Sequence, residues 1–240
     1  MGAPPFKLVL LGDSSVGKTS LVHRFTTEEF DPYTSNTIGA AFITKEYHSS
    51  TNPDKKVKFE IWDTAGQERY RSLTPMYYRN AKMALICYDL SNIPESFEKS
   101  KFWIDQLRIN DTSSDSSEIK IRVVGTKGDL LPNKPTPRES LEAGTETSTE
   151  EDATNEELDA VNTYCLESNI PHFITSAKLG QGISELFTSI IDEIDESFWD
   201  LYNQNQLEQE RIAKNGQSFG TIDFLNARFK KTETSKSCCS

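Results

Sequence analysis

Short apolar runs of strand length alternate along the chain with longer segments of helical spacing. Four apolar segments predict strands, a buried one at residues 6–11 and others at 84–88, 119–125 and 170–175. Helical spacing predicts helices at 20–25, 68–79, 94–110, about 156–168 and 183–202. Strands that alternate with helices predict an α/β domain with a mostly parallel sheet.

One pair of strands departs from this alternation. Residues 41–48 alternate weakly and residues 56–62 alternate clearly, with Val57, Phe59 and Ile61 on one face. Only a polar turn cluster separates the two segments. Because a parallel pair needs a long crossover connection, we expect these two strands to be antiparallel.

Two further segments fit neither pattern. Residues 132–157 hold eight acidic residues against Lys134 and Arg138, with many Thr and Ser and almost nothing apolar. We expect a disordered loop there, either a tolerated surface loop or a contact for a partner. From residue 203 the chain becomes polar. We therefore expect a domain at 1–202 and a flexible tail at 203–240.

Composition narrows the class of protein. The chain of 240 residues has 26 Lys and Arg against 37 Asp and Glu, for a net charge of −11. That balance argues against a nucleic-acid partner bound through a broad basic face. No apolar run approaches the roughly 18 residues of a membrane-spanning helix. The short run 8–11 lacks the cleavage site of a secretory signal, so we expect a cytosolic protein.

The sequence GDSSVGKT at 12–19 has the full pattern of a phosphate-binding loop, between a predicted buried strand and a helix. Gly12 and Gly17 let the backbone bring its N–H groups close to a phosphate, and the following helix adds positive potential. Lys18 reaches the β- and γ-phosphate oxygens, and Thr19 offers a hydroxyl to Mg²⁺. The expected phosphate-binding residues are Ser14, Ser15, Val16, Gly17, Lys18, Thr19, Ser20 and Gly66.

A second motif, DTAGQ at 63–67, follows the alternating strand. Asp63 at the strand end is expected to hold Mg²⁺ through water, and the backbone N–H of Gly66 to approach the γ-phosphate. Gln67 can orient a water for in-line attack, which makes it the catalytic candidate. Taken alone the motif could be an ordinary polar turn, but its pairing with the phosphate loop favours a nucleotide site.

Two motifs after later strands indicate which base is bound. Asp129, in the sequence TKGD at 126–129, can accept hydrogen bonds from N1 and N2 of guanine. Adenine lacks this pair of donors, so an ATP-dependent kinase with a phosphate loop is disfavoured against a GTP-binding protein. A backbone N–H of the sequence SAK can reach guanine O6. The expected guanine-binding residues are Phe30, Thr126, Lys127, Asp129, Ser176, Ala177 and Lys178.

These motifs, in this order and spacing, resemble small GTPases of the Ras superfamily, and within it the Rab or Ypt family. The resemblance is carried by GDSSVGKTSLVHRF (12–25), TIGAAF (37–42), KFEIWDTAGQERYRSLTPMYYRNA (58–81), TKGD, SAK and the CysCysSer end. It is closest to the endosomal, vacuole-directed branch of yeast Ypt proteins. It implies a Ras-like domain with a six-stranded sheet, one strand antiparallel, and helices on both faces.

The resemblance also assigns roles. Thr37 would be the threonine of the first switch, which closes on Mg²⁺ when the γ-phosphate is present. The second switch would begin at Gly66 and Gln67. Phe30 would lie over the guanine, with a core phenylalanine as the alternative. Three aromatic residues would form an effector surface, although core packing is an alternative for the first two: Phe42, Trp62 and Tyr77.

One residue departs from the family pattern in the base-recognition motif. The motif usually begins with Asn, which bridges guanine N7 and the phosphate loop, whereas this chain has Thr126. Threonine is shorter and cannot make both contacts. We therefore expect weaker nucleotide binding, while guanine specificity, which depends on Asp129, is less affected. A GTP-binding scaffold with little hydrolysis is the alternative function that this departure suggests.

The four cysteines fall into two groups. Cys87 and Cys165 lie in apolar surroundings and are expected to be small buried residues. Cys238 and Cys239 precede the last residue. No CaaX box is present, because Ser237 stands where that signal needs Cys. The ending resembles the Rab double-cysteine site for two geranylgeranyl chains, with free thiols as the alternative. Two chains would anchor the protein stably to a membrane.

Taken together, these features predict a monomeric, prenylated Rab-type GTPase that hydrolyses GTP to GDP slowly with Mg²⁺ and regulates transport from endosomes to the vacuole. The resemblance implies endosomal effectors, an exchange factor, a GTPase-activating protein, Rab escort protein and GDP-dissociation inhibitor as partners. We expect it on the cytoplasmic face of endosomal membranes, with a carrier-bound pool in the cytosol. No arginine is evident in the first switch segment, around Thr37, to act as a finger in cis, so an activating protein should supply one.

Overall fold

The computed structural model describes residues 2–52, 55–67, 70, 73–110, 119–131 and 148–214. The chain divides into two compact units, Met1–Glu193 and Ile194–Ser240. Among the described residues, no helix combines the length and apolar character needed to cross a bilayer.

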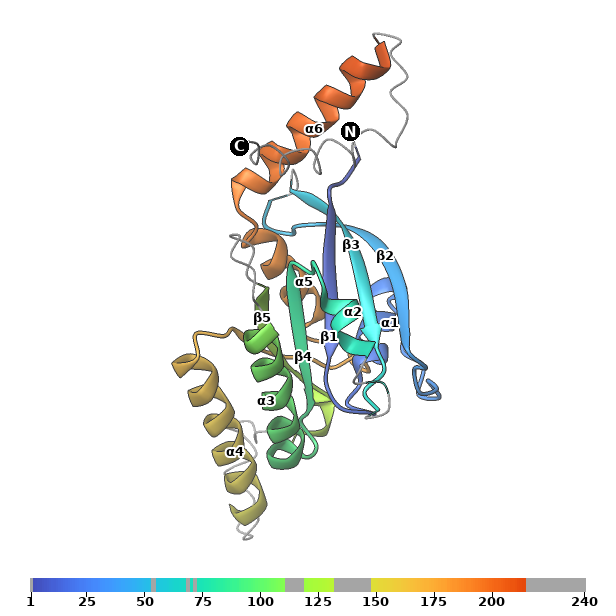
Figure 1. Ribbon diagram of the computed structural model, residues 1–240. Helices are drawn as coiled ribbons and strands as arrows, with labels where there is room; N and C mark the ends of the chain where they lie inside the picture. Colours follow the sequence, from blue (N-terminus) through green and yellow to red (C-terminus); the bar gives the residue numbers. More distant parts are fainter. Residues whose placement is uncertain are drawn as a thin grey trace, which may run out of the picture. The chain divides into compact units, whose positions relative to one another are not determined.

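The first unit is built on a six-stranded sheet with the order β2-β3-β1-β4-β5-β6 (Figure 1). Its strands are β1 (Pro5–Leu11), β2 (Ala40–His48), β3 (Lys56–Thr64), β4 (Met83–Asp89), β5 (Lys120–Thr126) and β6 (His172–Ile174). β2 and β3 pair antiparallel, and each of the other neighbouring pairs is parallel. The prediction of a mostly parallel sheet with one antiparallel strand is therefore confirmed.

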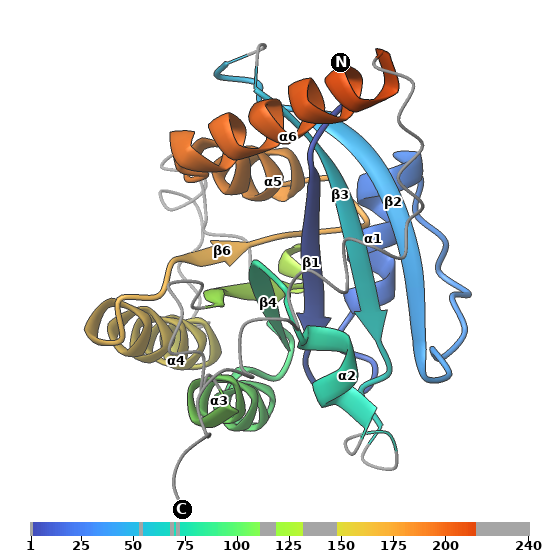
Figure 2. The same cartoon turned by 45° about the horizontal axis from the view of Figure 1, so that its top comes forward.

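Helices cover both faces of this sheet. They are α1 (Lys18–Thr27), α2 (Thr74–Tyr78), α3 (Ile93–Asn110), α4 (Ser148–Glu167) and α5 (Ile183–Asp192), with a short 3-10 turn at Gly128–Leu130. Figure 1 shows α2 and α3 in front of the sheet and α1 and α5 behind it, and α4 runs beside α3 in Figure 2. The apolar runs of β1, β4 and β5 are buried because both of their faces meet helices.

Each face has its own core. On the side of α1 and α5, the rings of Phe25 and Phe187 stack with centroids 3.5 Å apart, and Phe59 of β3 meets Phe187 edge-on. On the side of α3, Ile104 and Trp103 pack with Tyr88 of β4. Cys87 and Cys165 are both buried free thiols, as the sequence predicted.

The prediction of a disordered loop throughout 132–157 is wrong for its second part. α4 begins at Ser148, so residues 148–157 are helical, while 132–147 lie outside the described residues. Residues 148–157 resemble a loop in sequence because they lack the apolar residues by which α4 packs on the core. Those residues, Leu158, Val161 and Cys165, all fall in the second half of the helix. Acidic residues near a helix N-terminus are stabilised by the helix dipole.

The predicted helix at 183–202 is two helices, because α5 ends at Asp192 and a new helix, α6, spans Glu196–Lys214. At the end of α5 the carboxylate of Glu193 pairs with Arg122 at 2.5 Å and with Lys120 at 3.2 Å. The expectation of a flexible tail from 203 is wrong for 203–214, which belong to α6. That segment is rich in the helix formers Gln, Leu, Glu and Arg. Residues 215–240, including Cys238 and Cys239, lie outside the described residues.

Candidate nucleotide-binding site

The loop between β1 and α1 is shaped by its two glycines. Gly12 has φ +148°, and a Cβ atom there would lie 2.3 Å from the carbonyl oxygen of Cys87. Gly17 has φ +100°, a left-handed conformation that side chains rarely adopt. These two glycines therefore let the loop curl closely over the end of β4, as the phosphate-loop motif requires.

The loop borders a cavity of about 170 Å³. Its lining includes most of the predicted phosphate-binding residues together with the segment before β2: Ser14, Ser15, Gly17, Lys18, Thr19, Ser20, Thr34, Ser35, Asn36, Thr37, Thr64, Gly66 and Gln67. Val16 was also predicted here, but its side chain is buried and it is not among these described lining residues. Its carbonyl instead accepts a hydrogen bond from Thr126.

Lys18 is buried at this cavity and held by the loop itself. Its Nζ donates to the carbonyl oxygens of Gly12 at 3.0 Å and Asp13 at 2.7 Å. Burial lowers the pKa of Lys18, while the nearby carboxylates of Asp63 and Asp13 oppose that shift. A fixed ammonium group at a cavity lined by loop backbone is suited to bind phosphate oxygens.

Three oxygen-bearing side chains from separate elements meet beside Lys18. Thr19 Oγ1 of α1 lies 2.7 Å from Thr37 Oγ1 and 2.7 Å from Asp63 Oδ2, at the end of β3. The other carboxylate oxygen, Asp63 Oδ1, is buried and has no hydrogen-bond partner among the described residues. Burial also raises the pKa of Asp63, although the Thr19 hydroxyl and the charge of Lys18 oppose the shift.

This donor set fits Mg²⁺, which takes hard oxygen ligands and usually keeps several waters. A divalent cation would compensate the buried carboxylate, and a water bound to it could serve Asp63 Oδ1. The two threonine hydroxyls are the candidate direct ligands, and Asp63 is the candidate ligand through water, which are the roles expected from the sequence.

Two loops that the sequence assigned as switches close one side of the cavity. Ala65 N–H donates to the carbonyl of Gly39 at 2.8 Å, which joins the two loops through their backbones. Gly66 lies directly against the phosphate loop, because a Cβ atom there would fall 2.3 Å from the carbonyl oxygen of Asp13. Gln67 lines the cavity, where a side-chain amide can orient a water.

A second cavity, of about 180 Å³, adjoins the first at Gly17 and Ser20 and is mainly apolar. Its lining includes most of the predicted guanine residues: Gly17, Ser20, Leu21, Phe30, Thr126, Lys127, Asp129, Leu130, Thr175, Ala177 and Lys178. Phe30 lies at this cavity with 37% of its surface exposed, so the alternative of a core phenylalanine is wrong. A mainly apolar cavity with one carboxylate among its described lining residues is suited to a purine base.

The carboxylate of Asp129 is oriented from one side. Its Oδ1 accepts a hydrogen bond from Ser176 Oγ at 2.5 Å, and Lys178 Nζ lies 3.9 Å from Oδ2. Lys127, in a left-handed conformation with φ 59°, forms an ion pair of 2.5 Å with Asp89. Ser176 thus positions Asp129 through its hydroxyl and is not itself among the described residues that line the cavity.

Thr126 is buried at the end of β5, where it lines the second cavity. Its hydroxyl donates to the carbonyl of Val16 in the phosphate loop and lies 2.8 Å from the carbonyl oxygen of Tyr88. A hydroxyl has one proton, and both of these neighbours are acceptors. The threonine therefore keeps β5 tied to the phosphate loop, and its proton is used inside the protein.

The three predicted effector residues form one continuous aromatic surface on β2, β3 and α2. The ring centroid of Trp62 lies 5.1 Å from that of Phe42 and 5.6 Å from that of Tyr77. Phe42 is 52% exposed, which argues against core packing for it. Trp62 is partly buried against the core cluster. Ile38 and Met76 add exposed apolar surface from the flanking segments.

One residue near the phosphate loop was missed by sequence reasoning. Lys99 of α3 lies 2.9 Å from the carboxylate of Asp13. No motif links two residues so far apart in the chain. The only sequence signal is the spacing of Glu95 and Lys99, which are one helical turn apart and also form an ion pair.

The chain has clear similarity to known proteins. The sequence model of the Ras family matches residues 7–196. The chain is 40% identical over 243 residues to the GTP-binding protein YPT52 of Saccharomyces cerevisiae, which covers 98% of this chain and 99% of that protein. It is 44% identical over 188 residues to the GTP-binding protein ypt5 of Schizosaccharomyces pombe, covering 78% of this chain and 77% of the relative. The GTP-binding protein YPT53 of Saccharomyces cerevisiae is 39% identical over the same length.

Proposed function

The chain belongs to the Ras family of GTP-binding GTPases, and from this premise we propose that it is a Rab-type switch for endocytic, endosome-to-vacuole vesicle traffic. The observation that carries the proposal is the meeting of Thr19, Thr37 and Asp63 beside Lys18. Thr37 comes from the segment before β2, whereas Thr19 and Asp63 come from α1 and β3. A mobile segment that joins a metal and phosphate site is how such a switch reports its nucleotide.

The residues of the site have distinct tasks in this proposal. The backbone of 14–18 and the ammonium of Lys18 bind the phosphates, while Thr19, Thr37 and, through water, Asp63 hold Mg²⁺. When bound, Mg²⁺ neutralises charge that develops on the phosphate oxygens. Gln67 orients the attacking water, and Gly66 donates its N–H toward the γ-phosphate. Asp129 accepts from the guanine N–H groups, and Phe30 covers one face of the base.

Loss of the γ-phosphate would remove the contact that holds Thr37 and Gly66 inward. Because Ala65 N–H is bonded to Gly39, the two loops should then open together. The aromatic surface of Phe42, Trp62 and Tyr77 adjoins both loops, which supports its role as the effector surface in the GTP form. We propose that the chain acts as a monomer, with an exchange factor, an activating protein and endosomal effectors as partners.

The membrane part of the proposal depends on Cys238 and Cys239. Two geranylgeranyl chains on these residues would place the GTPase on the cytoplasmic face of endosomal membranes. Rab escort protein would present the chain for prenylation, and GDP-dissociation inhibitor would carry a pool through the cytosol. Mg²⁺ and GTP are the cofactor and substrate.

Two experiments test the nucleotide part. In competition with a fluorescent guanine nucleotide, GTP and GDP should displace the probe while a large excess of ATP should not. A single-turnover assay should show slow GTP hydrolysis that a Rab activating protein accelerates by roughly 10³- to 10⁵-fold. Hydrolysis that stays at the level of the uncatalysed reaction, with and without activator, would instead favour the GTP-binding scaffold. Lys18→Ala serves as the control, and it should retain no nucleotide on purification.

A further inference from the structure

Asp13 is the one carboxylate within the phosphate loop. Its carbonyl oxygen accepts the hydrogen bond from Lys18 Nζ at 2.7 Å, and its backbone is the surface against which Gly66 lies. The next two residues, Ser14 and Ser15, line the phosphate cavity. The loop that binds a polyanion therefore carries a negative charge of its own.

A lysine on α3 compensates this charge. Lys99 Nζ lies 2.9 Å from Asp13 Oδ2 and 2.8 Å from Glu95 Oε1, and Asp13 Oδ1 accepts a hydrogen bond from the N–H of Ser14 at 2.8 Å. Burial alone would raise the pKa of Asp13, but the bonds from Lys99 and from Ser14 N–H hold that pKa below its ordinary value. Asp13 is thus ionised and needs a cation beside it.

We propose that Lys99 is a positioning residue for the nucleotide phosphates, and that it acts through Asp13. The inference rests on the proposed function and adds a residue outside its motifs. Without Lys99, the carboxylate would repel the phosphates as an uncompensated like charge and compete with them for the ammonium of Lys18. It would also lose the contact that fixes its orientation toward the N–H of Ser14.

A structural alternative is that the pair only fastens α3 to the loop. The two roles differ in what they predict. A charge effect grows with the number of phosphates and is screened by salt. A mechanical effect would weaken GDP and GTP binding alike, at any salt concentration, and would not depend on the charge of Asp13.

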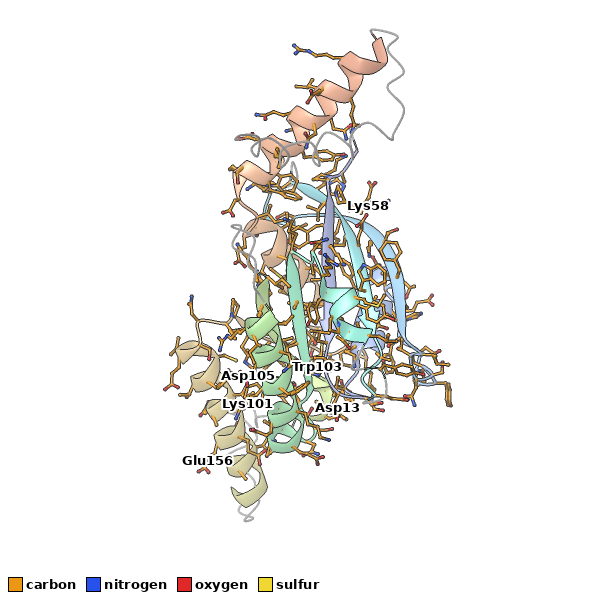
Figure 3. The ribbon with its side chains drawn as sticks, in the orientation of Figure 1. Asp13, Lys58, Lys101, Trp103, Asp105 and Glu156 are labelled. Carbon is orange, nitrogen blue, oxygen red and sulfur yellow. The ribbon has the colours of Figure 1, made fainter. Side chains whose placement is uncertain are left out.

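The test compares Lys99→Met with Lys101→Met. Lys101 lies two residues further along α3, pairs with Glu98 at 2.7 Å, and lies 5.5 Å from the ring centre of Tyr164 on α4. Figure 3 labels Lys101 and Asp13, which come from α3 and the phosphate loop respectively. Release of fluorescent GDP and of a fluorescent non-hydrolysable GTP analogue is followed from the full chain at fixed Mg²⁺. The salt concentrations are about 0.1 M and about 1 M, where the Debye length is about 10 Å and 3 Å.

Lys99→Met should release the GTP analogue roughly 3- to 10-fold faster than wild type at the lower salt, a modest factor because the ion pair is partly exposed. The effect on GDP should be smaller, because GDP has one phosphate fewer. The difference should shrink at the higher salt. Lys101→Met should stay within about twofold of wild type, and Lys99→Arg should restore the wild-type rate.

Asp13→Asn supplies the second arm of a double-mutant cycle, because Asn keeps an oxygen for Ser14 N–H and removes the charge. In that background Lys99→Met should change release by less than about twofold. The inference would be overturned if Lys99→Met released both nucleotides at the wild-type rate. It would also be overturned if Lys99→Met accelerated the release of both nucleotides equally and did so in the Asp13→Asn background too. A wild type that binds no guanine nucleotide would overturn the proposed function itself, so the two failures can be told apart.

Discussion

Gly66 and Asp13 are in backbone contact: a Cβ atom at residue 66 would fall 2.3 Å from the carbonyl oxygen of Asp13. The second switch loop therefore starts from a position that only glycine can take, directly over the phosphate loop. The same carbonyl accepts the hydrogen bond from Lys18. A change at residue 66 should thus be felt at the phosphates without removing any group that binds them.

Gly66→Ala should weaken GTP binding more than GDP binding. The added methyl group can be accommodated only if the second switch loop moves away from Asp13, and overpacking of this kind costs roughly 1–3 kcal/mol. The loss falls on the GTP state because that state needs the loop close to the γ-phosphate. Dissociation constants for GDP and a non-hydrolysable GTP analogue should diverge by about 5- to 100-fold relative to wild type. An unchanged ratio would show that the GTP state does not need this contact.

Gln67→Leu should trap the GTP form, because leucine cannot orient the attacking water. Leucine is close to glutamine in size, so nucleotide binding should be retained. The measurement is single-turnover hydrolysis, alone and with a Rab activating protein. A rate that falls only in the absence of activator would limit the role of Gln67 to intrinsic hydrolysis. A rate equal to wild type in both conditions would remove Gln67 from the mechanism.

The sheet and the nucleotide motifs could be predicted from sequence because their signals are local. A strand buried on both faces must be continuously apolar, and a loop that wraps a phosphate must have glycine where Gly12 and Gly17 stand. The first half of α4 and the second half of α6 could not be predicted as helices, because their residues are mostly polar and no apolar stripe marks them. The place of Lys99 beside the phosphate loop could not be predicted either, since Lys99 and Asp13 are adjacent only in the folded chain.

Folding stability should fall as the pH drops from about 6.5 to about 4, owing to His172. The ring lies between Tyr88 Oη, 2.9 Å from Nε2, and Asn162 Oδ1, 2.7 Å from Nδ1. Burial lowers the pKa of His172 from 6.5 to about 4. These partners assign the neutral tautomer, with Nδ1–H donating to Asn162 and Nε2 accepting from the Tyr88 hydroxyl.

The direction of this change in folding stability follows from the number of protons bound by the folded and the unfolded chain. Between the two pKa values the unfolded chain carries the proton on His172 and the folded chain does not, so acid favours unfolding. The contribution is complete above pH 6.5 and is lost as the pH falls through the folded pKa, and it amounts to at most about 3 kcal/mol. Denaturant unfolding of wild type and His172→Gln with saturating GDP and Mg²⁺ checks this. The variant should show a flatter pH dependence, and identical slopes would contradict the assignment.

Changing both Cys238 and Cys239 to Ser should release the protein from membranes and leave GTP binding intact. The proposed two-chain anchor predicts this, because a single lipid chain gives only marginal membrane binding and the double variant would carry no lipid chain. Cell fractionation measures the membrane-bound share, with Cys87→Ser as the control at a buried cysteine. Membrane association that persists in the double variant would show that another part of the chain is the anchor.

The hydroxyl proton of Thr126 is already committed to the carbonyl of Val16. The tie between β5 and the phosphate loop is thus retained, and the contact missing from the usual motif is the one to guanine N7. One hydrogen bond contributes about 0.5–1.5 kcal/mol net. We therefore expect GDP to leave wild type roughly 2- to 10-fold faster than it leaves Thr126→Asn.

The missing contact to guanine N7 also predicts how wild type and Thr126→Asn respond to 7-deaza-GDP, in which a C–H group replaces N7. Wild type should release GDP and 7-deaza-GDP at equal rates, because no side chain donates to N7. Thr126→Asn should hold GDP longer than 7-deaza-GDP, by a factor close to its advantage over wild type. Comparing two ligands on one protein separates the base contact from any change in stability that the substitution brings. If wild type also discriminates between the two nucleotides, another group reads N7 and Thr126 is not the cause of faster release.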